Sequence, residues 1–202
     1  MVGTTKVMIN RAPVLTLWAA VVAERLGYDR DAALTLGRSV AGINAKSKAL
    51  AIGRIEPPSP AEAAKRRRET KRDETIEIEL LGRVVRAKRT ADGLRATERG
   101  RPANPAAVQR YLESKFGDAL PAVRAAMKTL AASRTPSELA GDAFSLYEDF
   151  RPKIPPGMRG WGAAGELDLD LIRALAKRRT LQAPRAALLS RRASPARSRR
   201  PG

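Results

Sequence analysis

The spacing of apolar residues at the start of the chain predicts a central helix. Residues 11–26 are apolar on nearly every face, so we expect this helix to be buried, with Trp18 packed inside the fold. Asn10 precedes the run and is expected to accept hydrogen bonds from the first turn as an N-cap. Gly27 follows the run and is the expected stop.

A second helix is predicted directly after the first. Asp29 is its expected N-cap, and apolar side chains then recur at three- and four-residue spacing as far as Leu50. Two consecutive helices joined by a short glycine-containing turn pack as an antiparallel pair. The pattern therefore predicts an N-terminal helical hairpin within residues 1–55.

The period of the pattern changes to two after a charged linker at residues 56–74. Ser59 and Glu62 form the start signal of a helix over 61–72, which contains almost no large apolar residue. Alternation of apolar and polar residues then predicts strands near 75–80, 84–89 and 94–98, with turns at Gly82-Arg83 and at Asp92-Gly93. These three segments predict a three-stranded antiparallel meander.

Helical signals return after the meander. The start signals are Asn104-Pro105, Asp118 with Pro121, and Thr135-Pro136-Ser137-Glu138, and they predict helices near 105–116, 119–133 and 136–150. A loop at 152–165 precedes a short helix, capped by Asp168 or Asp170, that ends near Lys177. We therefore expect residues 75–177 to combine the meander with a helical subdomain, and 178–202 to form a disordered basic tail, since this tail has too few apolar residues to fold. The predicted fold class is α+β and mostly helical.

Composition restricts the chemistry that this fold can perform. The 202 residues include 39 Lys+Arg and 21 Asp+Glu, a net charge of +18, so we expect anionic partners. The absence of cysteine and histidine excludes disulfides, thiolate nucleophiles and histidine-based catalysis. No apolar stretch reaches the roughly 18 residues that a membrane span requires. Composition therefore favours a binding protein that does not act at a membrane.

The basic residues concentrate in two places. From Leu175 to the end, the chain holds nine basic residues and no acidic residue. The predicted phosphate contacts of the meander are Arg83, Arg86, Lys88, Arg89, Arg95, Arg99 and Arg101, and those of the tail are Arg191, Arg192, Arg197, Arg199 and Arg200. An alternative for the meander is that its arginines only solvate the outer face and discourage edge pairing.

Residues 22–38 resemble a known class of DNA-binding unit. A small residue at Ala23, a turn glycine at Gly27 and apolar residues at Val22, Leu26, Tyr28, Ala33 and Leu36 resemble the helix-turn-helix of bacterial and phage repressors. The resemblance implies that the second helix enters the major groove and directs Arg30, Leu34, Thr35 and Arg38 at bases or phosphates. A plain helical hairpin explains the same spacing.

The tail has a resemblance of its own. Its run from Ser190 to Pro201 is similar to the basic tails of linker histones and related nucleoid proteins, with Ser194-Pro195-Ala196-Arg197 as the matching element. The resemblance implies that the tail lies along duplex DNA.

Two further patterns are candidates for chemistry. Residues 160–165 have the glycine spacing of a dinucleotide fingerprint, but no strand precedes them, so we interpret them as a loop anchored by Trp161. Glu166, Asp168 and Asp170 are carboxylates that can hold a hard cation, or that favour the start of a helix. We predict no catalytic residue, no bound metal and no cofactor.

The sequence therefore predicts a non-catalytic protein that binds double-stranded DNA, of the nucleoid-associated or transcriptional-regulator type, in the bacterial cytoplasm. A homodimer is one arrangement that the helical parts allow. Two alternatives stay open: a protein-interaction module or dimeric scaffold, and an RNA- or ribosome-associated protein. A metal-dependent hydrolase built on Asp168 or Asp170 is a third and weaker alternative.

Overall fold

The structure is a computed structural model that describes residues 6–62, 64, 75–157 and 162–178. In chain order its elements are β1 (Lys6–Ile9), α1 (Arg11–Arg25), α2 (Arg30–Ala51), β2 (Ile76–Leu80), β3 (Arg83–Thr90), β4 (Gly93–Glu98), β5 (Arg101–Pro102), α4 (Pro105–Phe116), η1 (Gly117–Ala119), α5 (Leu120–Ala132), α6 (Pro136–Phe150) and β6 (Gly165–Asp168). A last helical segment covers 169–178. The predicted fold class, α+β and mostly helical, is confirmed.

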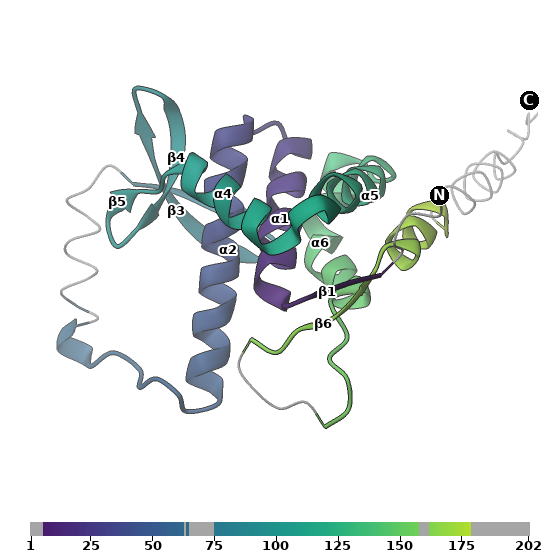
Figure 1. The fold of residues 1–202 in the computed structure, drawn as a ribbon. Coiled ribbons are helices and arrows are strands. Elements are labelled where there is room, and N and C mark those ends of the chain that lie inside the picture. Colours follow the sequence, from purple (N-terminus) through teal and green to yellow (C-terminus); the bar gives the residue numbers. More distant parts are fainter. Residues whose placement is uncertain (1–5, 63, 65–74, 158–161, 179–202) are drawn as a thin grey trace, which may run out of the picture.

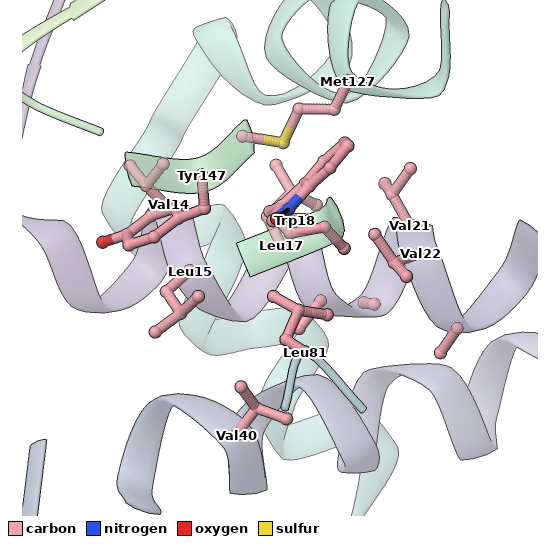
Figure 2. Packing of buried hydrophobic residues seen from close by; sticks show 14 of the residues in the cluster. Val14, Leu15, Leu17, Trp18, Val21, Val22, Val40, Leu81, Met127 and Tyr147 are labelled. Atoms are coloured by element: carbon pink, nitrogen blue, oxygen red, sulfur yellow. Dashed lines mark hydrogen bonds between the residues drawn. The ribbon is translucent and has the colours of Figure 1, made fainter. Parts of the chain in front are cut away.

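Helix α1 lies at the centre, as its apolar surface predicts. Its residues 13–23 are all buried, and α2, α4, α5 and α6 pack around it. Trp18 is fully buried, and its indole Nε1 donates a hydrogen bond to the carbonyl oxygen of Ala143 at 2.8 Å. The Trp18 ring meets the Phe150 ring edge to face, with centroids 5.3 Å apart, and Met127 approaches the indole from α5 (Figure 2). The indole thus links α1 to α6 as well as filling the core.

The helical hairpin of α1 and α2 is confirmed, and its two helices approach closely. Gly37 of α2 faces Thr16 and Ala20 of α1. A Cβ atom built on Gly37 would overlap the backbone oxygen of Thr16 and would lie 2.8 Å from the backbone nitrogen of Ala20. Only a residue without a side chain fits this crossing.

Two of the expected helix starts differ from the structure. The Asp29 side chain caps α2 by accepting from the Ala32 backbone nitrogen at 2.8 Å, as predicted. Asn10 occupies the cap position of α1, but its side chain makes no capping bond, so that expectation is wrong. Asp118 is also not a cap, because Gly117 adopts a positive φ of 52° and starts a short 3₁₀ turn that leads directly into α5.

The predicted meander is present with one added strand. Within the described residues, the sheet has the antiparallel order β2-β3-β4-β5. Its first turn is Leu81-Gly82, not Gly82-Arg83, because Leu80 pairs with Arg83. Leu81 has a φ of 51° although it is not a glycine, and its side chain is only 3 % exposed. Burial of this leucine offsets the conformational cost of its backbone.

Helix α2 joins the sheet to the helices. Figure 1 shows the sheet on one side of α2 and the helices α1, α5 and α6 on the other. Buried Thr35 of α2 accepts a hydrogen bond from the Ala96 backbone nitrogen at 3.1 Å and donates one to the Ala32 carbonyl at 2.9 Å. The Thr35 hydroxyl thus supplies an acceptor to a backbone donor of β4 inside the fold.

A second sheet of two strands was not expected from the sequence. β1 pairs antiparallel with β6, from Lys6 opposite Asp168 to Ile9 opposite Gly165. Asp168 then caps the helix at 169–178 by accepting from the backbone nitrogens of Asp170 and Leu171 at 2.9 and 3.1 Å, which decides between the two predicted caps. The pairing of β1 with β6 brings the two ends of the described chain together.

Some expectations fall outside the described residues. The start signal at Ser59 and Glu62 is confirmed by reciprocal hydrogen bonds, and the chain is helical at residues 60–62 and 64. The rest of that predicted helix and the whole of 179–202 lie outside the described part. In the part that is described, no helix has both the length and the apolar character that crossing a membrane requires.

Candidate nucleic-acid interface

The seven basic residues predicted in the meander do not all lie on one surface. Arg95 is the clearest exception, because it is only 6 % exposed. Its guanidinium lies 3.2 Å from the Asp31 carboxylate and 3.9 Å from that of Asp29, and it donates to the backbone oxygens of Asp92 and Leu94 at 2.7 and 2.8 Å. The prediction that Arg95 contacts phosphate is therefore wrong: this arginine ties β4 to the start of α2.

Arg83 also turns toward the helices. One of its terminal nitrogens donates to the Asn44 side-chain oxygen at 3.3 Å, and its guanidinium lies over the Phe144 ring at 5.4 Å. Its position beside the buried Leu81 turn explains this direction. Arg83 therefore connects the sheet to α2 and α6 and leaves little of its guanidinium for a phosphate.

Arg86 lies on the outer face of the sheet. It pairs with Glu77 across strands β2 and β3, with 3.8 Å between the Arg86 Nε and the Glu77 carboxylate. Both side chains are about half exposed. An exposed ion pair of this kind contributes little to stability.

Three of the remaining cations, Lys88, Arg99 and Arg101, lie near the turn that connects β4 to β5. Lys88 donates to the Gly100 carbonyl at 3.4 Å, which places it against the Arg99-Gly100 turn. Arg89, Arg99 and Arg101 are exposed. Arg99 adopts a φ of 50°, a turn conformation that holds its side chain at the tip between the two strands. We call Lys88, Arg99 and Arg101 the β3–β5 cationic cluster; Glu98 lies opposite Arg101 in register. Arg89 pairs with Leu94 beside the β3–β4 turn, at the other end of β4, and points to the opposite face of β3 from Lys88, so the structure does not place it in this cluster.

The segment that resembles a helix-turn-helix has its predicted turn, with Gly27 at a φ of 100°. Leu34 and Thr35 lie on α2 and are buried, so the expectation that they reach bases is wrong. Arg30 and Arg38 lie nearer the surface, but both contact α4. Arg30 donates to the Gln109 side-chain oxygen at 3.4 Å, and the Arg38 guanidinium lies 4.5 Å from the centre of the Tyr111 ring.

Arg124 joins Arg30 at the same acceptor, a contact that the sequence did not suggest. Arg124 donates to the Gln109 oxygen at 3.3 Å, and the Gln109 amide nitrogen donates to Glu113 at 2.7 Å. Burial, and next the positive charge of Arg30, lower the pKa of the Arg124 guanidinium below its usual value. The two arginines therefore share a neutral oxygen on the side of α2 that faces α4.

The acidic candidates are engaged in structural contacts. Glu166 pairs with Lys6 at 2.9 Å, Asp170 pairs with Arg173 at 2.9 Å, and Asp168 is the helix cap described above. Among the described residues, no group of three or more acidic, histidine or cysteine side chains is arranged to hold a metal ion. Gly160 and Trp161 of the glycine-rich motif lie outside the described residues.

The tail residues Arg191, Arg192, Arg197, Arg199 and Arg200 also lie outside the described part of the chain. The structure thus brings together three of the predicted meander cations, Lys88, Arg99 and Arg101, and keeps Arg86 on the outer face. Arg89 lies apart, beside the β3–β4 turn, and Arg83 and Arg95 contact the helices instead. Alternation in the sequence places Lys88 and Arg89 on opposite faces, but it could not show that Arg83 and Arg95 contact Asn44 and Asp31 of α2, which are distant in the sequence.

The contacts of Arg95 predict a structural role that can be measured. Replacing Arg95 by glutamine should lower the free energy of unfolding by about 2 kcal/mol, since the two backbone carbonyls and Asp31 lose a buried charged donor. Urea unfolding measures this loss, and DNA affinity of the folded variant should stay within about twofold of the parent. A large loss of DNA affinity at unchanged stability would restore Arg95 to the interface.

Comparison of the chain with protein-family models, with curated proteins and with solved structures finds no match, so the arrangement of these residues is the basis for assigning a function.

Proposed function

We propose that this protein binds double-stranded DNA without catalysing a reaction. The observation that carries the proposal is the β3–β5 cationic cluster, in which Lys88 of β3 contacts the β4–β5 turn that contains Arg99 and leads into Arg101. Phosphates repeat along each DNA strand, so neighbouring cations on a rigid ribbon can neutralise several of them at once and release condensed counterions. The C-terminal residues, with nine basic and no acidic side chains from Leu175 onward, add to the same attraction.

The proposed phosphate contacts fix where the protein lies on the duplex, but they do not recognise the base sequence. Lysine and arginine bound to phosphates fix the register of a protein on DNA but distinguish no base. Leu34 and Thr35, which would have faced the bases in a helix-turn-helix, are buried. The proposal is therefore a nucleoid-associated protein of low sequence preference, acting on bacterial DNA in the cytoplasm.

A salt titration of DNA binding tests the cluster directly. Replacing Lys88, Arg99 and Arg101 by glutamine should reduce the slope of log affinity against log salt by about 2.7, or about 0.9 for each phosphate that is no longer neutralised. Fluorescence anisotropy of a labelled duplex, measured at several salt concentrations, gives this slope. Sequence-unrelated duplexes should be affected equally.

The matched control removes the same charge from other elements. Lys46, Arg110 and Lys115 are exposed; the first lies on α2 and the other two lie on α4. Their triple glutamine variant has the same net charge as the cluster variant and should keep the parental slope within about 0.5. Equal effects of the two triple variants would contradict the proposal, as would absence of binding at low salt. Tighter binding of duplex RNA than of duplex DNA would assign the surface to RNA instead.

A further inference from the structure

A cavity among the described residues lies away from the cationic cluster. It has a volume of about 580 Å³, opens to solvent, and is lined by the first turn of α1, the C-terminal half of α2, the last turn of α6 and parts of the loop that follows α6. Cavities of a few hundred Å³ are the usual size of small-molecule sites in proteins. Nothing in the proposed contact with DNA uses this cavity.

One part of the cavity wall is apolar. Leu15 and Ala41 form a buried floor, and Ile154 contributes from the loop. Ile52, just after α2, is 56 % exposed although it is a large apolar residue. Figure 2 shows Leu15 and Tyr147 close together on the α1 and α6 sides of this floor. An apolar group bound here would cover surface that water now contacts.

The other part of the wall is cationic. Arg11, Lys48, Arg54 and Arg151 line the cavity, and among the described lining residues Glu148 is the acid. Glu148 pairs with Arg151 at 2.7 Å, and the Arg11 Nε donates to the Pro152 carbonyl at 3.2 Å. With the Glu148–Arg151 pair and Arg54 set aside, Arg11 and Lys48 still give the lining an excess of positive charge. A negatively charged ligand would be attracted to it.

Asn10 supplies an acceptor to which no described residue donates. It lines the cavity, and its side-chain oxygen is buried without a hydrogen-bond partner in the described part of the chain. A buried polar atom of this kind costs free energy unless a partner reaches it. The first turn of α1 beside it contains no acidic residue, so its partial positive charge also faces the cavity without compensation.

Tyr147 provides no negative charge to balance these groups. Its hydroxyl donates to the Arg11 carbonyl at 3.3 Å, and burial raises its pKa to about 12. The phenol therefore stays neutral at physiological pH, and the cavity keeps its positive character.

We propose that this cavity binds a small amphiphilic anion. A carboxylate, sulfonate or phosphate group would lie near Lys48 and Arg11, and an apolar portion would cover Leu15, Ala41 and Ile52. A hydroxyl or N–H group of the ligand would donate to Asn10. The site is separate from the β3–β5 cationic cluster, so it stands whether or not the protein binds DNA.

Binding of the fluorescent probe 1-anilinonaphthalene-8-sulfonate to the full-length protein tests this site, because the probe combines a sulfonate, an N–H donor and two aromatic groups. We expect saturable binding at one site per chain. The uncharged analogue N-phenyl-1-naphthylamine, which lacks the sulfonate, should bind at least about tenfold more weakly. Equal affinity for the two probes would overturn the proposal.

Three variants locate the probe. Lys48→Glu should weaken its binding about tenfold or more, whereas Lys46→Glu, an exposed change on the same helix outside the cavity, should leave it within about twofold. Ala45→Phe, which adds a ring to the lining, should remove binding. Circular dichroism and urea unfolding confirm that each variant is folded. If Lys46→Glu weakens binding as much as Lys48→Glu, the probe is responding to overall charge and the proposed site is wrong.

Discussion

Replacing Gly37 by alanine is expected to lower the free energy of unfolding by about 2–3 kcal/mol. The added methyl group would meet the backbone of Thr16 and Ala20, and neither backbone can move without shifting α1 away from α2. Such a shift would loosen the packing around Trp18, which lies between these two positions in the sequence of α1. Urea unfolding followed by circular dichroism measures the change.

Gly42 provides the matched control on the same helix. It is exposed, and a Cβ atom added there meets nothing within 4 Å. Because alanine is the better helix former, Gly42→Ala should raise the free energy of unfolding by up to about 1 kcal/mol. Opposite signs for the two glycines are expected. A similar response at both positions would mean that the helices do not cross at Gly37 as described.

Replacing Trp18 by alanine should cost about 3–5 kcal/mol of unfolding free energy. The change removes the largest fully buried side chain in the core and leaves a cavity between α1, α5 and α6. It also removes the hydrogen bond to the Ala143 carbonyl and the edge-to-face contact with Phe150. For a domain of ordinary stability this is a large fraction of the total.

Trp18→Phe separates the two contributions. Phenylalanine keeps an aromatic ring but has no N–H donor, so it should cost about 1–2 kcal/mol, well below the cost of alanine. Thermal and urea unfolding of both variants measure the difference. If alanine and phenylalanine were equally destabilising, the hydrogen bond to Ala143 would account for most of the stabilisation by Trp18, and packing of its ring would contribute little.

Helices and strands that are indicated by patterns over short distances in the sequence were predicted well. The helices of the N-terminal hairpin and the helix at 136–150 follow from apolar spacing and from caps such as Asp29 and Thr135. The three main strands follow from alternation. In each case the residues that give the sequence signal are the same residues that form the element. The prediction of the element therefore needs no knowledge of distant contacts.

Features that depend on distant contacts were not predicted. β1 is four residues long and pairs with a strand more than 150 positions away, so it has too few residues to show a period. Arg95 resembles its basic neighbours in the sequence, and only the approach of Asp31 from α2 buries it. The cavity beside Asn10 is formed by α1, α2 and α6 together, and no single segment contains its pattern.

The pairing of β1 with β6 has a consequence for how the chain would hold a polymer. The described chain begins at Lys6 and ends at Arg178 on the same side of the molecule, while the sheet with the β3–β5 cationic cluster lies at the other side (Figure 1). The basic residues beyond Arg178 therefore start from a point distant from the cluster. If both regions bind DNA as proposed, they would form a bivalent binder, whose avidity depends on whether one ligand can span both. Such an architecture favours a long duplex that reaches around the fold, or two duplexes bridged by one molecule.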